Sequence, residues 1–189
     1  MATDGRPGLR RWLETRYGRK GEALYVFGAG FVAVALSGAV AYAFDQPLIL
    51  LALGPTVHLF FVQPLAPVAS PRSAVTGHLV ALSVGFLSLS LFGLVETSHV
   101  TPGDPFSYVY TGPTALAVGL TGAILVAARA WHHPAGVTAV VVGLGMLDEL
   151  RDFFVLAAAA VLLTYAGWLV NRASGVRVTL WSATDSRRR

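Results

Sequence analysis

The sequence lacks cysteine and has few charged residues among its 189 positions. Without cysteine, disulfide frameworks, cysteine-ligated zinc or iron sites and thiol nucleophiles are excluded. Charged side chains make up 13% of the chain, about half the share of a typical soluble domain. Only nine of them lie between Leu24 and Val170, mostly in clusters between apolar stretches. That is too few for the polar surface of a water-soluble globule, so the composition indicates a protein embedded in lipid.

Six apolar stretches are candidates for membrane spans, since a helix needs about 20 apolar residues to cross a bilayer, or fewer when neighbours shelter it. The second and fifth are short. The sequence therefore predicts an all-α, polytopic transmembrane helical bundle of about six spans, two of them short and containing Gly or Pro. The stretches run approximately over 24–44, 47–62, 74–95, 113–130, 134–147 and 153–170.

The distribution of charge predicts the orientation of these spans, because Lys and Arg in short loops are retained in the cytoplasm. With the N-terminus inside and six spans, 13 of the 14 basic residues fall on the cytoplasmic side and only Arg151 falls outside. The acidic residues Asp45, Glu96 and Asp104 lie in outer loops, as do Asp148, Glu149 and Asp152. We therefore expect a multi-pass protein of the cell membrane with both termini cytoplasmic.

The two ends of the chain form basic tails, over 1–22 and 171–189, around a transmembrane domain at 23–170. Leu9, Trp12, Leu13 and Tyr17 lie near helical spacing with arginines between them, which is typical of an interfacial amphipathic helix. A disordered basic tail is the alternative. Residues 176–181 alternate in polarity as a short strand does.

Glycine and proline interrupt the second span at Gly54 and Pro55. Pro55 removes a helical donor, so either a break with a half-helix N-terminus or a simple packing kink is expected there. His58 lies in the same span, and an ionisable group inside a membrane is a functional candidate by default. A neutral His58 bonded to a neighbour is the alternative.

Two connections on the inner face, 63–72 and 129–134, resemble each other as a loose two-hairpin repeat, each with a proline just before a new helix. Arg72 and Pro134, followed by Gly136, mark helix N-termini with a positive dipole end that attracts anions. His78, Arg129 and His132 would add charge nearby. For Arg72 the alternative is a topology anchor at the lipid headgroups.

Metal chemistry fits the sequence poorly. His132 and His133 are adjacent, so on a helix their side chains diverge by about 100°. There is no HExxH pattern and no carboxylate within the apolar stretches. We therefore expect no enzymatic activity, no catalytic residue, no metal and no cofactor. Several glycines, among them Gly119, Gly122 and Gly143, are interpreted as helix-packing positions.

Three segments of the chain resemble the HPP family of small integral membrane proteins. They are Leu53–Phe60, Pro67–Leu79 and His132–Ala139, and the similarity covers roughly Pro47 to Leu169. The family's His-Pro-Pro reads His132-His133-Pro134 here. Some plastid and cyanobacterial members are associated with nitrite transport, so the resemblance implies a transport function.

Residues and resemblance together predict a transporter of a small inorganic anion such as nitrite. The expected substrate-binding residues are Gly54, His58, Arg72, His78, Arg129, His132, Pro134 and Gly136. The expected partners are the lipid bilayer and the anion, not nucleic acid, while proton coupling and a homo-oligomer stay open. Two alternatives remain: a structural or regulatory membrane subunit, and a membrane enzyme with a metal held by His58, His78 and His132.

Overall fold

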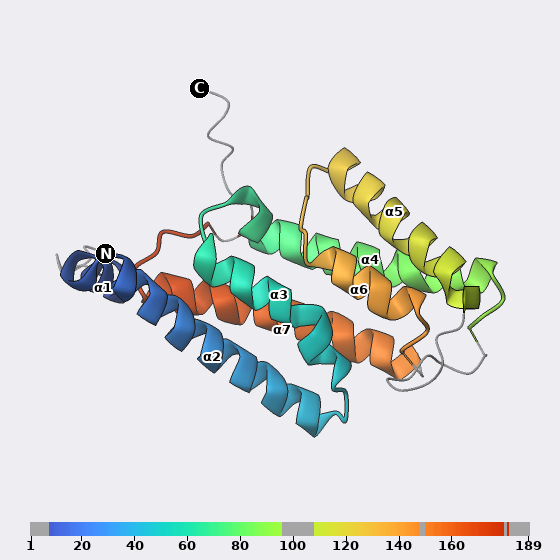
Figure 1. Ribbon diagram of the computed structural model, residues 1–189, viewed down its shortest axis with the longest axis horizontal. Helices are drawn as coiled ribbons and strands as arrows, with labels where there is room; N and C mark the ends of the chain where they lie inside the picture. The colour runs from blue at the N-terminus through green and yellow to red at the C-terminus, as the bar shows by residue number, and fades with distance from the viewer. Residues whose placement is uncertain (1–7, 96–107, 148–149, 180, 182–189) are drawn as a thin grey trace.

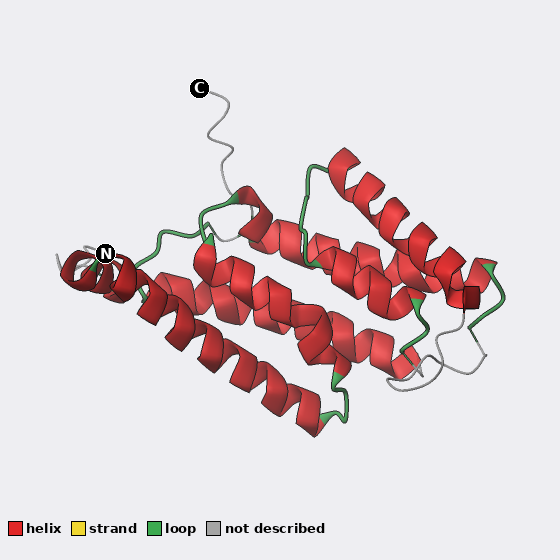
Figure 2. Ribbon diagram, viewed as in Figure 1, coloured by secondary structure: helices red, strands yellow, loops and turns green. Residues whose placement is uncertain are grey.

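The computed structural model describes residues 8–95, 108–147, 150–179 and 181, and over these ranges the regular structure is entirely helical (Figures 1 and 2). Seven α-helices and two short 3-10 turns follow one another in the described chain. The bounds are α1 Leu9–Tyr17, α2 Arg19–Ala43, α3 Leu48–Val62, η1 Pro67–Ala69, α4 Pro71–Leu91, η2 Tyr108–Tyr110, α5 Thr111–Ala127, α6 Ala135–Gly143 and α7 Leu150–Ala173.

Helices α2 to α7 correspond to the six predicted apolar stretches, and they form the polytopic bundle that the composition indicated. Four segments of the described chain are long and apolar enough to cross a membrane: Arg19–Ala43, Pro71–Leu91, Tyr108–Ala127 and Leu150–Ala173. Helix α6 has 9 residues and rises about 14 Å, less than half of a hydrocarbon core. Large apolar side chains such as Phe27 and Phe31 are exposed on α2, as expected for a surface that contacts lipid.

The bundle consists of two groups of three helices, α2–α3–α7 and α4–α5–α6, joined where α4 packs against α7 and α3 against α6 (Figure 1). In the second group, α4 presents Gly77, Ala81 and Gly85 at four-residue spacing to α6. A Cβ added to Gly77 would lie 2.9 Å from the His132 Cβ, and one added to Gly85 would lie 2.6 Å from the Val142 Cβ. Glycine therefore allows the close approach of α6 and its preceding loop to α4, as small residues do in membrane helix pairs.

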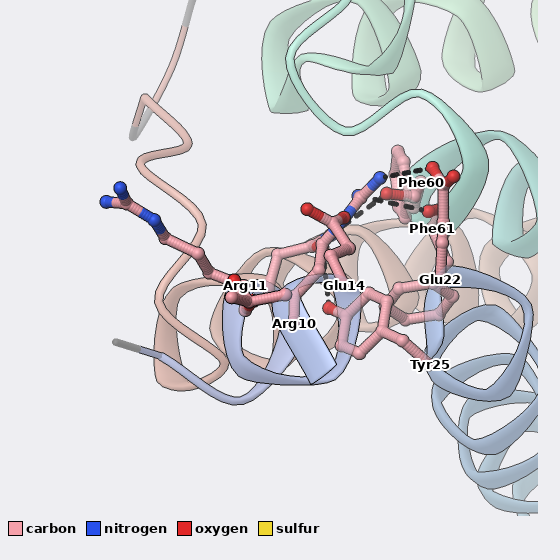
Figure 3. Close-up of polar contacts among 9 residues, drawn as sticks. Arg10, Arg11, Glu14, Glu22, Tyr25, Phe60 and Phe61 are labelled. Atoms are coloured by element: carbon pink, nitrogen blue, oxygen red, sulfur yellow. Dashed lines mark hydrogen bonds and ion pairs between the residues drawn. The ribbon is translucent and has the colours of Figure 1, made fainter. Parts of the chain in front are cut away.

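Within the N-terminal tail, Leu9–Tyr17 form the docked helix α1 rather than a disordered segment. The Arg10 side chain donates to Glu14 (2.7 Å) and Glu22 (3.0 Å), and also to the Phe61 carbonyl at the end of α3 (3.3 Å; Figure 3). The Arg10 amide bonds the Ser174 carbonyl just after α7, so the two ends of the described chain lie side by side. Leu13 is buried, whereas Trp12 and Tyr17 are exposed as interfacial side chains would be.

The structure excludes one alternative for local structure and contradicts two predictions. Of the break and the packing kink considered at Pro55, the break is excluded, because helix α3 continues through this residue and no half-helix begins there. Residues 176–179 form no strand, since the Val176 amide turns back to the Asn171 carbonyl. The two inner hairpins are not equivalent: α5 packs against α6, whereas α3 packs mainly against α2 and α7 because η1 carries the chain sideways before α4 begins.

The prediction of helix-packing glycines is also only partly correct. Gly143 lies against Thr114, where an added Cβ would come within 2.7 Å of the Thr114 backbone. Gly119 and Gly122, by contrast, have open space beside them in the described part of the chain. The glycines that set the helix spacing are instead those of α4, which the sequence did not single out because they are surrounded by polar as well as apolar neighbours.

Candidate functional site

Two buried histidines and two buried threonines meet at the junction between the two helix groups. His78 of α4 lies with its Nε2 2.8 Å from the Thr56 Oγ1 of α3 and its Nδ1 2.8 Å from the Thr138 Oγ1 of α6. The His132 Nε2 is 3.3 Å from the same Thr56 oxygen, and its Nδ1 is 2.8 Å from the Val68 carbonyl of η1. All four side chains are at most 1% exposed. We call this set the Thr–His chain.

The Val68 carbonyl fixes the direction of every bond in the neutral Thr–His chain. A carbonyl only accepts, so the His132 Nδ1 carries the proton and its Nε2 accepts from the Thr56 hydroxyl. Thr56 has then used its one proton and must accept from the His78 Nε2–H. The His78 Nδ1 in turn accepts from the Thr138 hydroxyl. One arrangement of protons therefore satisfies all four groups without a charge, as buried polar networks require.

An added proton reverses this chain in three short transfers. Thr138 passes its proton to the His78 Nδ1 as it takes a new one, His78 passes its Nε2 proton to Thr56, and Thr56 passes its own to the His132 Nε2. The result is an imidazolium at His132, with every other group neutral again. The geometry thus connects the hydroxyl of α6 to the imidazole beside η1 through an unbroken series of hydrogen bonds.

Local backbone structure brings His132 into the bundle. The connection from α5 to α6 is irregular, and within it Ala130 and His132 are buried while Trp131 and His133 are exposed. Irregular backbone at this position is tolerated because protein, rather than lipid, surrounds it. His133 points elsewhere, as predicted: its Nε2 accepts from the Trp131 indole N–H at 2.7 Å.

Burial lowers the pKa of His132, which lies outside the membrane-spanning helices, to about 4. The bond to the Val68 carbonyl opposes this shift, and the nearby His133 adds to it. The neutral imidazole is therefore the resting form near neutral pH, in agreement with the proton arrangement above. Protonation of His132 requires a compensating negative charge close by.

Arg72 and Arg129 lie together at the same end of the bundle, but they do not contact the Thr–His chain. The Arg72 guanidinium donates to the Ala128 carbonyl (2.9 Å) and the Arg129 carbonyl (3.4 Å) at the C-terminus of α5. The Arg72 amide bonds the Trp181 carbonyl. Arg129 is exposed and has a left-handed backbone with φ of 51°. Their predicted role in binding an anion stays a prediction.

The remaining predicted residues lie on a different surface. His58 is exposed and lines a groove with Pro55, His133 and Pro134. The first amides of α6 after Pro134, including that of Gly136, already bond backbone carbonyls within the turn. Gly54 and Gly136 have open space beside them. His58 thus does not join His78 and His132, which is the grouping that the metal-enzyme alternative required.

The sequence matches the family profile described as "HPP, transmembrane region" over residues 16–179. The chain belongs to the HPP family. The match extends further toward both ends than the resemblance seen in the sequence, and it includes the end of α1 and the segment after α7. No curated protein and no solved structure matches the chain. This HPP protein is therefore an integral membrane protein with several apolar helices.

Sequence reasoning missed Thr56 and Thr138 as site residues of this HPP protein. Both lie inside the segments that carry the family resemblance, next to residues that were singled out. A signal was present, because each is a hydroxyl in an otherwise apolar helix and must find a partner when buried. Which of the protein's buried hydroxyls reach a histidine depends on how three helices pack, and this could not be read from spacing alone.

Proposed function

We propose that this HPP protein transports a small inorganic anion such as nitrite together with a proton, and that the Thr–His chain is its proton-binding element. The observation that carries the proposal is the burial of two hydrogen-bonded imidazoles between the two helix groups. Ionisable groups inside membrane bundles are costly and characteristically belong to ion or proton pathways. Transporter sites also lie at the interface between helix groups, next to interrupted helices.

Coupling follows from the electrostatics of His132. An anion that arrives nearby stabilises the imidazolium, so it favours uptake of a proton through the Thr–His chain. The titratable groups next to His132 are His78 from α4 and His133 on its own connection. The helices α3 and α6 present only the hydroxyls of Thr56 and Thr138 to this pair, and η1 presents a carbonyl. Uptake should therefore increase as the external pH falls.

Flux of a panel of anions into proteoliposomes tests this function without any partner protein. Nitrite, nitrate, formate and chloride are presented at external pH values from 5 to 8 to vesicles with the wild-type chain, His132→Gln or His133→Gln. Wild-type and His133→Gln vesicles should take up at least one anion faster at low pH, and His132→Gln should flatten the profile. Absence of flux for every anion would favour the structural-subunit alternative instead.

A further inference from the structure

A polar cavity lies beside the Thr–His chain, at the end of the bundle where α3 ends and α4 begins. Its volume is about 180 Å³, enough for several water molecules or a small ion. The walls come from α3, from the start of α4, from α7 and from the segment that follows α7. The lining includes Phe60, Ser70, Trp168, Asn171, Arg177 and Thr179.

The lining side chains with hydrogen-bonding capacity left over can act as donors. Asn171 donates to the Phe60 and Gly167 carbonyls and accepts from Tyr25, so its amide is fully used. The Trp168 indole N–H has no partner in the described part of the chain, but it is shielded from the open space of the cavity. Neither the Arg177 guanidinium nor the Thr179 hydroxyl bonds any described residue. A ligand that supplies acceptor atoms and negative charge would complement these groups.

The charge of the lining residues also favours a negatively charged ligand. Arg177, which is exposed, is the one charged side chain among the described lining residues, and these residues include no carboxylate. The planar guanidinium of Arg177 matches the two oxygens of a small oxyanion or carboxylate.

Phe60 separates the cavity from His132. Phe60 is 3% exposed, and its ring centroid lies 6.5 Å from that of the His132 ring. The same residue lines the cavity and packs closely over Gly167. A negative charge in the cavity is therefore one aromatic ring away from the imidazole that receives the proton, across a region of low dielectric constant.

We propose that this cavity is an oxyanion-binding site, with Arg177 as its cation and Phe60 as the partition between the bound anion and the Thr–His chain. The site takes a small oxyanion with at least two acceptor oxygens, of which nitrite is one and the phosphate of an anionic lipid headgroup is another. The proposal rests on the transport function proposed above for its role in coupling, but the binding site itself does not.

Binding of nitrite to the purified full-length chain tests the site directly. The chain is placed in phosphatidylcholine nanodiscs in a low-chloride buffer, and sodium nitrite is titrated by calorimetry. Arg177→Gln removes the charge from the cavity lining, whereas Arg172→Gln removes a neighbouring cation that packs on Trp168 without lining the cavity. Arg177→Gln should weaken binding about tenfold, as loss of one charge-assisted bond does, and Arg172→Gln should bind as the wild type.

A second arm distinguishes the two sources of the oxyanion. Phosphatidylglycerol is added in place of nitrite, and lipid retained on the protein is measured by native mass spectrometry. Retention that depends on Arg177 and blocks nitrite binding would assign the site to a headgroup phosphate. Equal nitrite affinity in all three proteins, or no Arg177-dependent binding of nitrite or lipid, would overturn the site. Nitrite binding without flux would remove the transport function and leave the site, whereas unchanged flux kinetics in Arg177→Gln would remove the site's role in coupling.

Discussion

At the scale of single residues, Thr56 is the group on which the Thr–His chain depends. Its one hydroxyl contacts both imidazoles, so it both accepts a proton and donates one. Replacing a hydroxyl by a methyl group at constant shape leaves buried nitrogen atoms unpaired, which costs about 1–3 kcal/mol. Loss of the Thr56 hydroxyl should therefore destabilise this protein far more than the small size of the side chain suggests.

Thr56→Val should lower the thermal unfolding midpoint in detergent micelles, and Thr56→Ser, which keeps the hydroxyl, should restore most of it. Thr121→Val is the matched control, because the Thr121 hydroxyl is buried in α5 with no partner in the described chain. Valine at that position removes an unsatisfied group and should leave the midpoint unchanged or raise it. Equal losses in Thr56→Val and Thr121→Val would argue against a bonded Thr–His chain.

Gly77 positions His132 through its lack of a side chain. Gly77→Ala would place a Cβ 2.9 Å from the His132 Cβ and 3.2 Å from the Ala135 Cβ, so the loop before α6 must move away from α4. We expect lower stability and loss of the tautomers derived above, which ¹⁵N NMR of labelled histidines reports. Gly136 lies one turn after His132 and has open space beside it, so Gly136→Ala should keep both the stability and the histidine tautomers. Unchanged histidine spectra in Gly77→Ala would contradict this packing.

At the scale of elements, the Arg10 side chain makes the polar contacts that join α1 to α2 and α3. Arg10 connects α1 to α2 and to the end of α3, and its guanidinium also lies over the Tyr25 ring, 5.4 Å from the centroid. Arg11 is exposed and points away from this cluster (Figure 3). Substitutions at these two neighbouring arginines therefore separate the effect of the docking contacts from the effect of surface charge alone.

Arg10→Ala should release α1, which would appear as faster hydrogen–deuterium exchange in peptides covering residues 9–17. Arg11→Ala should leave the exchange unchanged, although it removes the same charge from the membrane surface. If both variants exchange at the wild-type rate, α1 is held by Leu13 and the lipid interface rather than by the Arg10 contacts.

The helices also show what could be predicted from the sequence and what could not. Apolar length placed α2 to α7 correctly, because lipid imposes a simple requirement on each span. Helical spacing also indicated α1. Of the break and the packing kink considered at Pro55, the structure excludes the break, since one missing donor within a helix otherwise held by its neighbours does not end it. The site required the packing of α3, α4 and α6, and here the sequence predicted two histidines but not the hydroxyls that join them.

At the scale of the whole molecule, the contact between Arg10 and Ser174 places the start of α1 and the end of α7 on one side of the bundle. We therefore expect an even number of crossings, with the short α6 making one of them. Reporter fusions at Gly5 and after Arg189 should therefore give the same side, and the distribution of basic residues predicts that it is the cytoplasm. Reporters on opposite sides would mean that α6 and its connection return to the face from which they came.

We propose that anion movement is coupled to a proton carried by the Thr–His chain. The most direct test is the number of protons taken up with each nitrite ion. Nitrite uptake and internal pH are recorded together in proteoliposomes under an imposed pH gradient, with protein-free vesicles setting the leak of undissociated acid. The wild-type chain should acidify the interior by one proton per nitrite taken up, and Thr56→Val in correctly inserted protein should abolish this acidification. Nitrite uptake by Thr56→Val with the wild-type proton stoichiometry would contradict the account.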